Sequence, residues 1–226
     1  MRTFSCSAIL FDLDGVLLDS TRVVAQQYTR WAQEHGLDPA EVMKAAHGVR
    51  TVEVVRRVAP HLDAEAETKR IEEREAAAEN LSPVPGAVAL VNSIPRGLWG
   101  VVTSGTRFLA TARMRKFGIP IPDVLVTADD VKHGKPDAEP YRRGAELLGF
   151  EPSTCLVVED APAGIRAGHA AGMRVISLPT TCAREELHEA DVVASGLHEI
   201  HVTLDGEKGR GTLIVSVADR GARQKL

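Results

Sequence analysis

Two aspartates near the start of the chain stand where they could hold a cation. The stretch FDLDGVLLDS (residues 11–20) places Asp12 and Asp14 two residues apart, directly after the apolar run SAILF at 7–11. Carboxylates this close repel each other and raise each other's pKa, so the pair is unfavourable on its own. A divalent cation beside them would offset the repulsion. The pair therefore predicts a cation site where a buried strand ends.

Polar side chains also stand at the ends of the later apolar runs. The run LWGVVT ends in Thr103, DVLVT leads to Lys135, and TCLVVE ends in Glu159. The same segments also contain Ser104, Gly105, Asp129, Asp130, Lys132 and Asp160. Because the carboxyl ends of parallel strands meet at one edge of a sheet, where ligands bind, we expect these groups to converge. Carboxylates, a hydroxyl group and a lysine together are typical of a hard cation beside an anion.

Five of these residues are suited to transferring a phosphoryl group, whereas Lys132 is expected to face solvent and Asp129 with Asp130 to form an acidic loop that shapes the site. Mg²⁺ prefers oxygen ligands, commonly one or two carboxylates together with waters and a phosphate. Asp12 can attack phosphorus as a nucleophile, and Asp14 can protonate the leaving oxygen and later take a proton from water. Lys135 would neutralise charge on the phosphoryl group. The hydroxyl group of Thr103 and the backbone N–H of Ser104, just before a helix, would hold its oxygens.

The elements that must position these residues alternate along the chain. Near-continuous apolar runs predict strands buried on both faces, and their alternation with helical stretches predicts a parallel sheet. We therefore expect an α/β fold with a Rossmann-like, doubly wound sheet. A terminal hairpin is expected at 201–217, followed by a frayed tail at 218–226. The expected strands are 7–11, 98–103, 123–127, 154–159 and 174–178, and the expected helices between them are 85–94, 106–118, 138–149 and 161–172.

One long section interrupts this alternation. Between residues 20 and 84 the sequence has no strand-like run, and its periodicity predicts helices. We therefore expect an all-helical cap at 20–84, inserted after the first strand, and an α/β core made of 1–19 and 85–226. The stretch SPVPGA at 82–87 is the expected return hinge. The four helical stretches are 21–36, 39–48, 51–60 and 64–81.

Two local features of the cap have structural interpretations. The charged run at 63–79 predicts a solvent-facing helix, supported by pairs four residues apart such as Glu65 with Lys69. Ser20, after Asp19, is expected to cap the first cap helix with its side chain.

Composition narrows the class of protein. The chain has 226 residues, of which 44% are hydrophobic and 26% charged, as is typical of globular proteins. Its net charge of −4 argues against a nucleic-acid partner, and no apolar run approaches the length of a membrane span. The N-terminus leads straight into a strand, unlike a signal peptide. We expect a cytoplasmic monomer or weak homodimer, with Cys6, Cys155 and Cys182 as buried free thiols.

Four segments resemble the motifs of a known superfamily. FDLDGVLLDS, VVTSGT (101–106), GKP (134–136) and VVEDAPAGIRAG (157–168) are similar to the four motifs of the haloacid dehalogenase superfamily of phosphatases. The helical insert resembles the small cap of its β-phosphoglucomutase-like subfamily. The stretches HGVRT, VPGAVAL and TADDVKHGKPDAEPY are similar to those of glycerol-3-phosphate and 2-deoxyglucose-6-phosphate phosphatases. Four motifs in the right order are far more specific than any one of them.

The resemblance implies catalytic roles for particular residues. Asp12 matches the nucleophile and Asp14 the general acid/base, while Thr103 and Lys135 match the residues of the second and third motifs. It implies hydrolysis of a small sugar or polyol phosphate through an aspartyl-phosphate. Arg50 in the cap matches a substrate-contacting position.

The resemblance also implies the groups that hold the cofactor and the phosphate. Asp160, the Asp12 carboxylate and the Asp14 backbone carbonyl would bind Mg²⁺. Glu159 is either a further metal ligand or an acid that contacts the ligands without binding the metal itself. Ser104 and Gly105 would bind the phosphoryl group.

Other functions remain open from the sequence. A phosphosugar mutase would use the same nucleophile but return the phosphoryl group to the sugar. A dehalogenase fits less well, because halide departure does not need the acid/base chemistry of Asp14. A phospho-receiver signalling domain also joins an acidic pocket, a Thr or Ser and a Lys, yet it needs no cap of about sixty residues. A non-catalytic scaffold would be expected to have lost the carboxylates.

Overall fold

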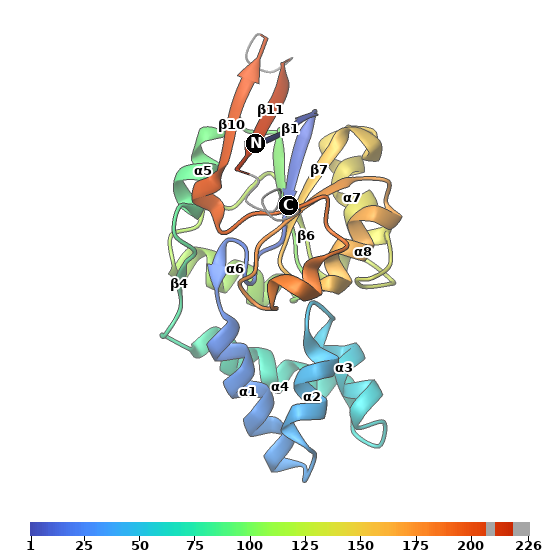
Figure 1. The fold of residues 1–226 in the computed structure, drawn as a ribbon. Coiled ribbons are helices and arrows are strands. Elements are labelled where there is room, and N and C mark those ends of the chain that lie inside the picture. Colours follow the sequence, from blue (N-terminus) through green and yellow to red (C-terminus); the bar gives the residue numbers. More distant parts are fainter. Residues whose placement is uncertain (207–210, 219–226) are drawn as a thin grey trace, which may run out of the picture.

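A parallel sheet of six strands lies at the centre of the computed structural model, which describes residues 1–206 and 211–218 (Figure 1). Its order is β6-β5-β2-β7-β8-β9, and every neighbouring pair is parallel. The α/β fold with a Rossmann-like sheet is therefore confirmed, and each predicted strand is present. The short strand β9 was not predicted. The strands are β2 (Ala8–Phe11), β5 (Trp99–Val102), β6 (Val124–Val126), β7 (Cys155–Glu159), β8 (Arg174–Ser177) and β9 (Val192–Val193).

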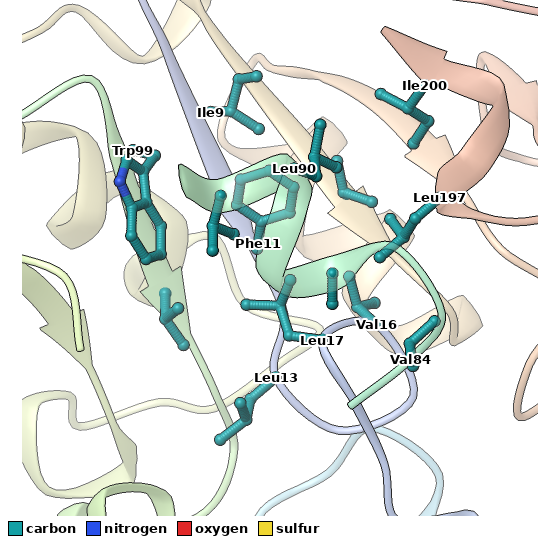
Figure 2. Close-up of a cluster of buried hydrophobic side chains, with 14 of the residues drawn as sticks. Ile9, Phe11, Leu13, Val16, Leu17, Val84, Leu90, Trp99, Leu197 and Ile200 are labelled. Atoms are coloured by element: carbon teal, nitrogen blue, oxygen red, sulfur yellow. The ribbon is translucent and has the colours of Figure 1, made fainter. Parts of the chain in front are cut away.

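Helices cover both faces of this sheet. Successive side chains of a strand point to opposite faces, so Ile9 and Phe11 join one buried cluster while Ala8 and Leu10 join another. Figure 2 shows the first cluster, which includes Phe11 of β2 and Leu90 of a covering helix. The first face is covered by α5 (Ala87–Ser93) and α6 (Arg107–Lys116), the second by α7 (Glu139–Leu148) and α8 (Pro162–Ala170).

A second, antiparallel sheet joins the two ends of the described chain. Its order is β1-β11-β10, with β1 (Arg2–Cys6), β10 (Ile200–Asp205) and β11 (Thr212–Val217). The predicted terminal hairpin is thus confirmed as β10 and β11. Strand β1 was not predicted, because only Ser7 separates it from β2. Within the tail predicted at 218–226, residues 219–226 lie outside the described residues.

Helices α1–α4 form the section predicted as a cap. They share a buried cluster of their own, which includes Trp31, Val55 and Ile71. Figure 1 shows them gathered below the α/β part of the molecule. Ser20 precedes α1 as expected, but its side chain makes no capping hydrogen bond, so that detail of the prediction is wrong. The helices are α1 (Thr21–Glu34), α2 (Pro39–Ala46), α3 (Thr51–Val58) and α4 (Ala64–Ala77).

The chain enters and leaves this section along a small pair of strands. Strand β3 (Leu18–Asp19) pairs antiparallel with β4 (Ser82–Pro83). The prediction of no strand between 20 and 84 is therefore wrong at residues 82–83, where the two connections hydrogen-bond to each other. Four short 3₁₀ helices complete the described elements: η1 (Ala128–Asp130), η2 (Pro152–Thr154), η3 (Arg184–Leu187) and η4 (Leu197–Glu199).

The prediction that α4 presents its charges to solvent is wrong for three of its glutamates. Glu67, Glu72 and Glu75 are buried, because helical spacing puts them on the same inner face as Ile71. The ion pair expected between Glu65 and Lys69 is also wrong, because each residue pairs with a different partner. Glu65 pairs with Arg56 at 2.5 Å, and the Nζ of Lys69 lies 3.9 Å from Glu73.

Two expectations from composition can be checked in the described residues. Cys6, Cys155 and Cys182 are free and buried, as predicted. Within residues 1–206 and 211–218, none of the helices combines the length and the apolar character that crossing a membrane requires.

Candidate active site

Three buried carboxylates from two strand ends meet at one edge of the sheet. Asp12 follows β2, Glu159 ends β7, and Asp160 follows it. One oxygen from each lies within 4.8 Å of the others. Burial raises the pKa of Asp12 to about 7, although the neighbouring Lys135 opposes the rise. Burial and the charge of Glu159 raise the pKa of Asp160 well above its usual value.

The surroundings of Asp12 and Asp160 suit a hard cation. The donors are all oxygens, and both carboxylates resist ionisation because negative charge is concentrated in a buried place. A divalent cation would relieve that concentration. Thr181, from the segment after β8, donates a hydroxyl hydrogen bond to Asp160, while the hydroxyl of Thr180 donates to the carbonyl of Gly15 at 2.5 Å and lies 3.4 Å from Oδ2 of Asp160. Sequence reasoning missed both threonines.

Gly15 allows the two acidic segments to approach each other. Its φ of 82° lies in the left-handed region, which favours glycine. A Cβ atom at this position would overlap the carboxylate of Asp160. The glycine after Asp14 is therefore required both for the turn and for the closeness of Asp160.

Lys135 places a positive charge directly beside Asp12. Its Nζ lies 2.7 Å from Oδ1 of Asp12 and 2.6 Å from Oε1 of Glu159, and it also donates to the carbonyl of Val102. The side chain is only 1% exposed. Burial by itself would lower the pKa of Lys135, but the two carboxylates outweigh it and raise that pKa above its usual value. Lys135 therefore remains charged next to the predicted nucleophile.

Glu159 is held by four donors of the protein. Its Oε1 accepts hydrogen bonds from Lys135 and from the hydroxyl of Tyr141 at 2.8 Å. Its Oε2 accepts from the backbone N–H groups of Asp160 and Ala161, at 2.9 and 3.2 Å. Of the two roles that the sequence left open, this arrangement favours support of Lys135 over direct metal binding.

A cavity of about 100 Å³ lies between the sheet edge and helices α1–α4. Six of the predicted site residues line it: Asp12, Asp14, Thr103, Ser104, Gly105 and Asp160. Side chains from α1–α4 and their connections close the other side, among them Tyr28, His47, Thr51 and Glu75. The segments after β2, β5 and β7 thus line one cavity as expected, and the segment after β6 reaches this site through Lys135, which contacts Asp12.

Arg50 lies outside the lining of this cavity. It precedes α3 and forms an ion pair with Glu53. Its guanidinium also donates to the carbonyls of Val131 and Lys132, at 3.1 and 2.8 Å. In this structure, Arg50 therefore joins the helical section to the loop after β6. A second link runs from the hydroxyl of Ser104 to the carbonyl of Gly48, at 2.9 Å.

Sequence reasoning missed an ionic cluster on the other side of Asp14. Arg113 of α6 places Nη1 2.6 Å from Oδ1 of Asp14 and Nη2 3.1 Å from Oε2 of Glu75. Burial raises the pKa of Glu75 to about 7, with Arg113 opposing the rise. The signal that could have found this cluster is periodicity. Arg113 shares the buried face of α6 with Leu109, Ala110 and Met114, as Glu75 shares that of α4 with Ile71.

Known proteins similar to this chain share a hydrolase family. A profile of haloacid dehalogenase-like hydrolases matches residues 6–172. Hexitol phosphatase A of Escherichia coli (strain K12) is 42% identical over 204 residues, which cover 88% of this chain and 94% of that protein. The 2-deoxyglucose-6-phosphate phosphatase 1 of Saccharomyces cerevisiae is 34% identical over 235 residues, covering 92% of this chain and 95% of the yeast protein.

Two further similarities agree with these matches. Glycerol-1-phosphate phosphohydrolase 2 of Saccharomyces cerevisiae is 36% identical over 211 residues, covering 87% of this chain and 84% of the relative. Among solved structures, CbbY from Rhodobacter sphaeroides in complex with phosphate superimposes with a TM-score of 0.74 at 25% identity. That match covers 86% of this chain and 96% of CbbY.

Proposed function

Because the chain belongs to the haloacid dehalogenase-like hydrolases, we propose that it hydrolyses a small sugar or polyol phosphate monoester. Three relatives, 42%, 34% and 36% identical, are named hexitol phosphatase, 2-deoxyglucose-6-phosphate phosphatase and glycerol-1-phosphate phosphohydrolase. The observation that carries the proposal is the buried pair of Asp12 and Lys135, 2.7 Å apart, at the edge of a cavity that Asp160 also lines.

In the first step, a carboxylate oxygen of Asp12 attacks phosphorus and the bond from phosphorus to the ester oxygen breaks. Lys135 balances the charge of Asp12 and of the phosphoryl oxygens beside it. The hydroxyl of Thr103 and the backbone N–H of Ser104 hold the phosphoryl group. Asp14 gives its proton to the departing oxygen, which leaves as an alcohol.

In the second step, water attacks the phosphorus of the aspartyl-phosphate. Asp14, now without its proton, takes one from that water, and inorganic phosphate leaves with Asp12 restored. Glu159 keeps Lys135 beside Asp12 throughout, since its remaining lone pairs are engaged by Tyr141 and by backbone N–H groups.

The proposed cofactor is Mg²⁺. The Asp12 and Asp160 carboxylates and the backbone carbonyl of Asp14 would hold it. When bound, it would neutralise negative charge on the phosphoryl group and on the two carboxylates.

Residues 20–84 are proposed to act as a cap over the site, and 1–19 with 85–226 as the catalytic core. Side chains of α1–α4 and their connections, among them Tyr28 and Glu75, line the cavity opposite the sheet edge. Movement of the cap would open the site to substrate, and its two connections to the core run side by side as the paired strands β3 and β4. Closure excludes water and brings cap side chains to the leaving group.

Replacement of Asp12 tests the proposed function. Asp12→Asn removes the nucleophilic oxygen with almost no change in size, so turnover of p-nitrophenyl phosphate and of sorbitol 6-phosphate should be abolished. Asp123→Asn is the control, because Asp123 is exposed and pairs with Arg96 on the surface. Undiminished activity of Asp12→Asn, with both variants folded, would refute the assignment.

A further inference from the structure

A buried ionic cluster connects the Asp14 motif to the cap, and the catalytic steps above do not use all of it. Arg113 donates to Asp14 of the core and to Glu75 of cap helix α4. The side chains of Arg113 and Glu75 are only 2% and 4% exposed. All three residues line the cavity where the substrate is proposed to react.

Stability does not explain this cluster. Removing a cation and carboxylates from water is unfavourable, and apolar replacements of similar volume are often equally stable or more so. The hydrogen bonding of Arg113 is also incomplete, because its buried Nε has no hydrogen-bond partner among the described residues. A purely structural contact between α6 and α4 would be served better by apolar side chains such as those at Leu109 and Ile71.

The geometry of the cluster suits the orientation of Asp14. A guanidinium presents its donors in a fixed plane, so anchoring one end determines the direction of the other. Glu75 anchors Nη2, and Nη1 then meets Oδ1 of Asp14 at 2.6 Å. With Oδ1 held in this way, Oδ2 is left to carry the proton. The Asp14 side chain is 28% exposed, so it retains access to the cavity.

We propose that Arg113 is a positioning residue that orients the Asp14 carboxylate for proton transfer, and that Glu75 of the cap holds Arg113 in place. The inference rests on the proposed function, which gives Asp14 its acid/base role. A group that transfers a proton must lie within hydrogen-bond reach of its target, and small displacements slow the reaction strongly. Arg113 acts through Asp14 and does not itself exchange the proton.

Two substrates with different leaving groups can distinguish a misplaced Asp14 carboxylate from a general loss of structure. An alkoxide such as that of sorbitol 6-phosphate leaves poorly without a proton, whereas p-nitrophenolate leaves without one. Loss of Asp14 alignment should therefore slow the first step for sorbitol 6-phosphate and spare it for p-nitrophenyl phosphate. The second step also needs Asp14, so it should slow for both substrates.

The test compares Arg113→Met, Arg113→Lys and Glu75→Gln with the wild-type enzyme, with Mg²⁺ present. Arg113→Met should lower kcat on sorbitol 6-phosphate by about 10²-fold with little change in KM. On p-nitrophenyl phosphate it should show a burst of p-nitrophenol equal to the enzyme concentration, followed by slow turnover. Arg113→Lys should recover part of kcat, and Glu75→Gln should show the same pattern with a smaller loss. Arg115→Met is the matched control, since Arg115 is an exposed arginine of the same helix, and its kinetics should equal the wild type.

The proposal is overturned if Arg113→Met slows the first step equally for both substrates, or leaves both unchanged. If Arg113→Met fails to fold, Arg113→Lys and Glu75→Gln carry the same comparison, and equal effects on the two leaving groups would again overturn it. Failure of the proposed function is distinguishable, because it appears as activity retained by Asp12→Asn.

Discussion

The charge of Lys135 determines how a buried aspartate can serve as a nucleophile. Asp12 is buried, which favours its protonated form, and a protonated carboxyl group is a poor nucleophile. The ammonium group 2.7 Å away favours the ionised form. Glu159 accepts a second hydrogen bond from this ammonium and helps Asp12 to keep Lys135 charged, although its own negative charge raises the pKa of Asp12. A buried lysine and buried carboxylates thus depend on one another, because each charge offsets the unfavourable burial of the opposite charge.

Glu75 makes the stability of the protein depend on pH. Its pKa rises from 4.5 to about 7 in the folded state, so the folded protein binds this proton more tightly than the unfolded chain does. The resulting stabilisation is present below pH 4.5 and is lost as pH rises through about 7. Glu75→Gln should remove this dependence, gaining stability relative to wild type by up to about 3 kcal/mol between pH 5 and pH 8.

Urea unfolding of both proteins at several pH values, with EDTA present, checks this expectation. Glu73→Gln is the control, since the Glu73 side chain is 56% exposed on the same helix and its curve should parallel that of the wild type. A constant difference in unfolding free energy between Glu75→Gln and wild type would contradict the role assigned to burial of Glu75.

At the scale of elements, the contact between β7 and α8 sets the place of Glu159. A Cβ atom at Gly164 would overlap the Glu159 carboxylate, so the helix can pack against the acid only where glycine stands. Gly164→Ala should displace Glu159 and with it Lys135, lowering kcat and destabilising the fold by about 1–3 kcal/mol. Glu159→Asp shortens the acid, so the double variant should recover part of the loss in stability.

A double-mutant cycle of unfolding free energies measures this interaction. Additive effects of Gly164→Ala and Glu159→Asp would show that the two positions do not compete for space. The kcat of each variant then shows whether displacement of Glu159 also impairs the reaction of Asp12.

The sequence predicted elements better than it predicted which of their faces are buried. The apolar runs before Asp12, Thr103 and Glu159 identified the strands, because strands covered on both faces are almost continuously apolar. The helix α4 was also predicted, but the burial of Glu75 was not. Its partner Arg113 lies 38 residues away, and only the folded structure brings the two together.

Short elements were missed for a different reason. Strands β4 and β9 contain two residues each, too few to show any periodicity. Arg50 illustrates a third limit. The motif located it in the connection before α3, yet the direction of its guanidinium depends on the backbone carbonyls of Val131 and Lys132, which no local pattern specifies.

At the scale of the whole molecule, a cation should stabilise the fold as well as support catalysis. Burial and neighbouring charges raise the pKa of Asp12 and of Asp160, so the folded protein gains free energy when a cation neutralises them. Adding Mg²⁺ at pH 8 should raise the Tm, with a gain of about 2.7 kcal/mol at a concentration of 100 times Kd. Asp160→Asn should lose most of this response, whereas Asp123→Asn should keep it, because the Asp123 side chain is 51% exposed and pairs with Arg96 on the surface.

A thermal unfolding series with increasing Mg²⁺ makes the measurement independent of activity. Equal shifts in Asp160→Asn and in the control would place the cation elsewhere. Removal of Mg²⁺ by EDTA should abolish turnover of p-nitrophenyl phosphate, and its addition should restore it.

In the proposed reaction, Asp12 carries the phosphoryl group as a covalent intermediate. Asp14→Asn should slow breakdown of the intermediate while p-nitrophenyl phosphate still forms it, because that leaving group needs no proton. Acid quenching of this variant during turnover, followed by peptide mass analysis, should find the phosphoryl group on Asp12 and none in Asp12→Asn. Phosphate release without any phosphorylated peptide, or a phosphoryl group on another residue, would contradict the account.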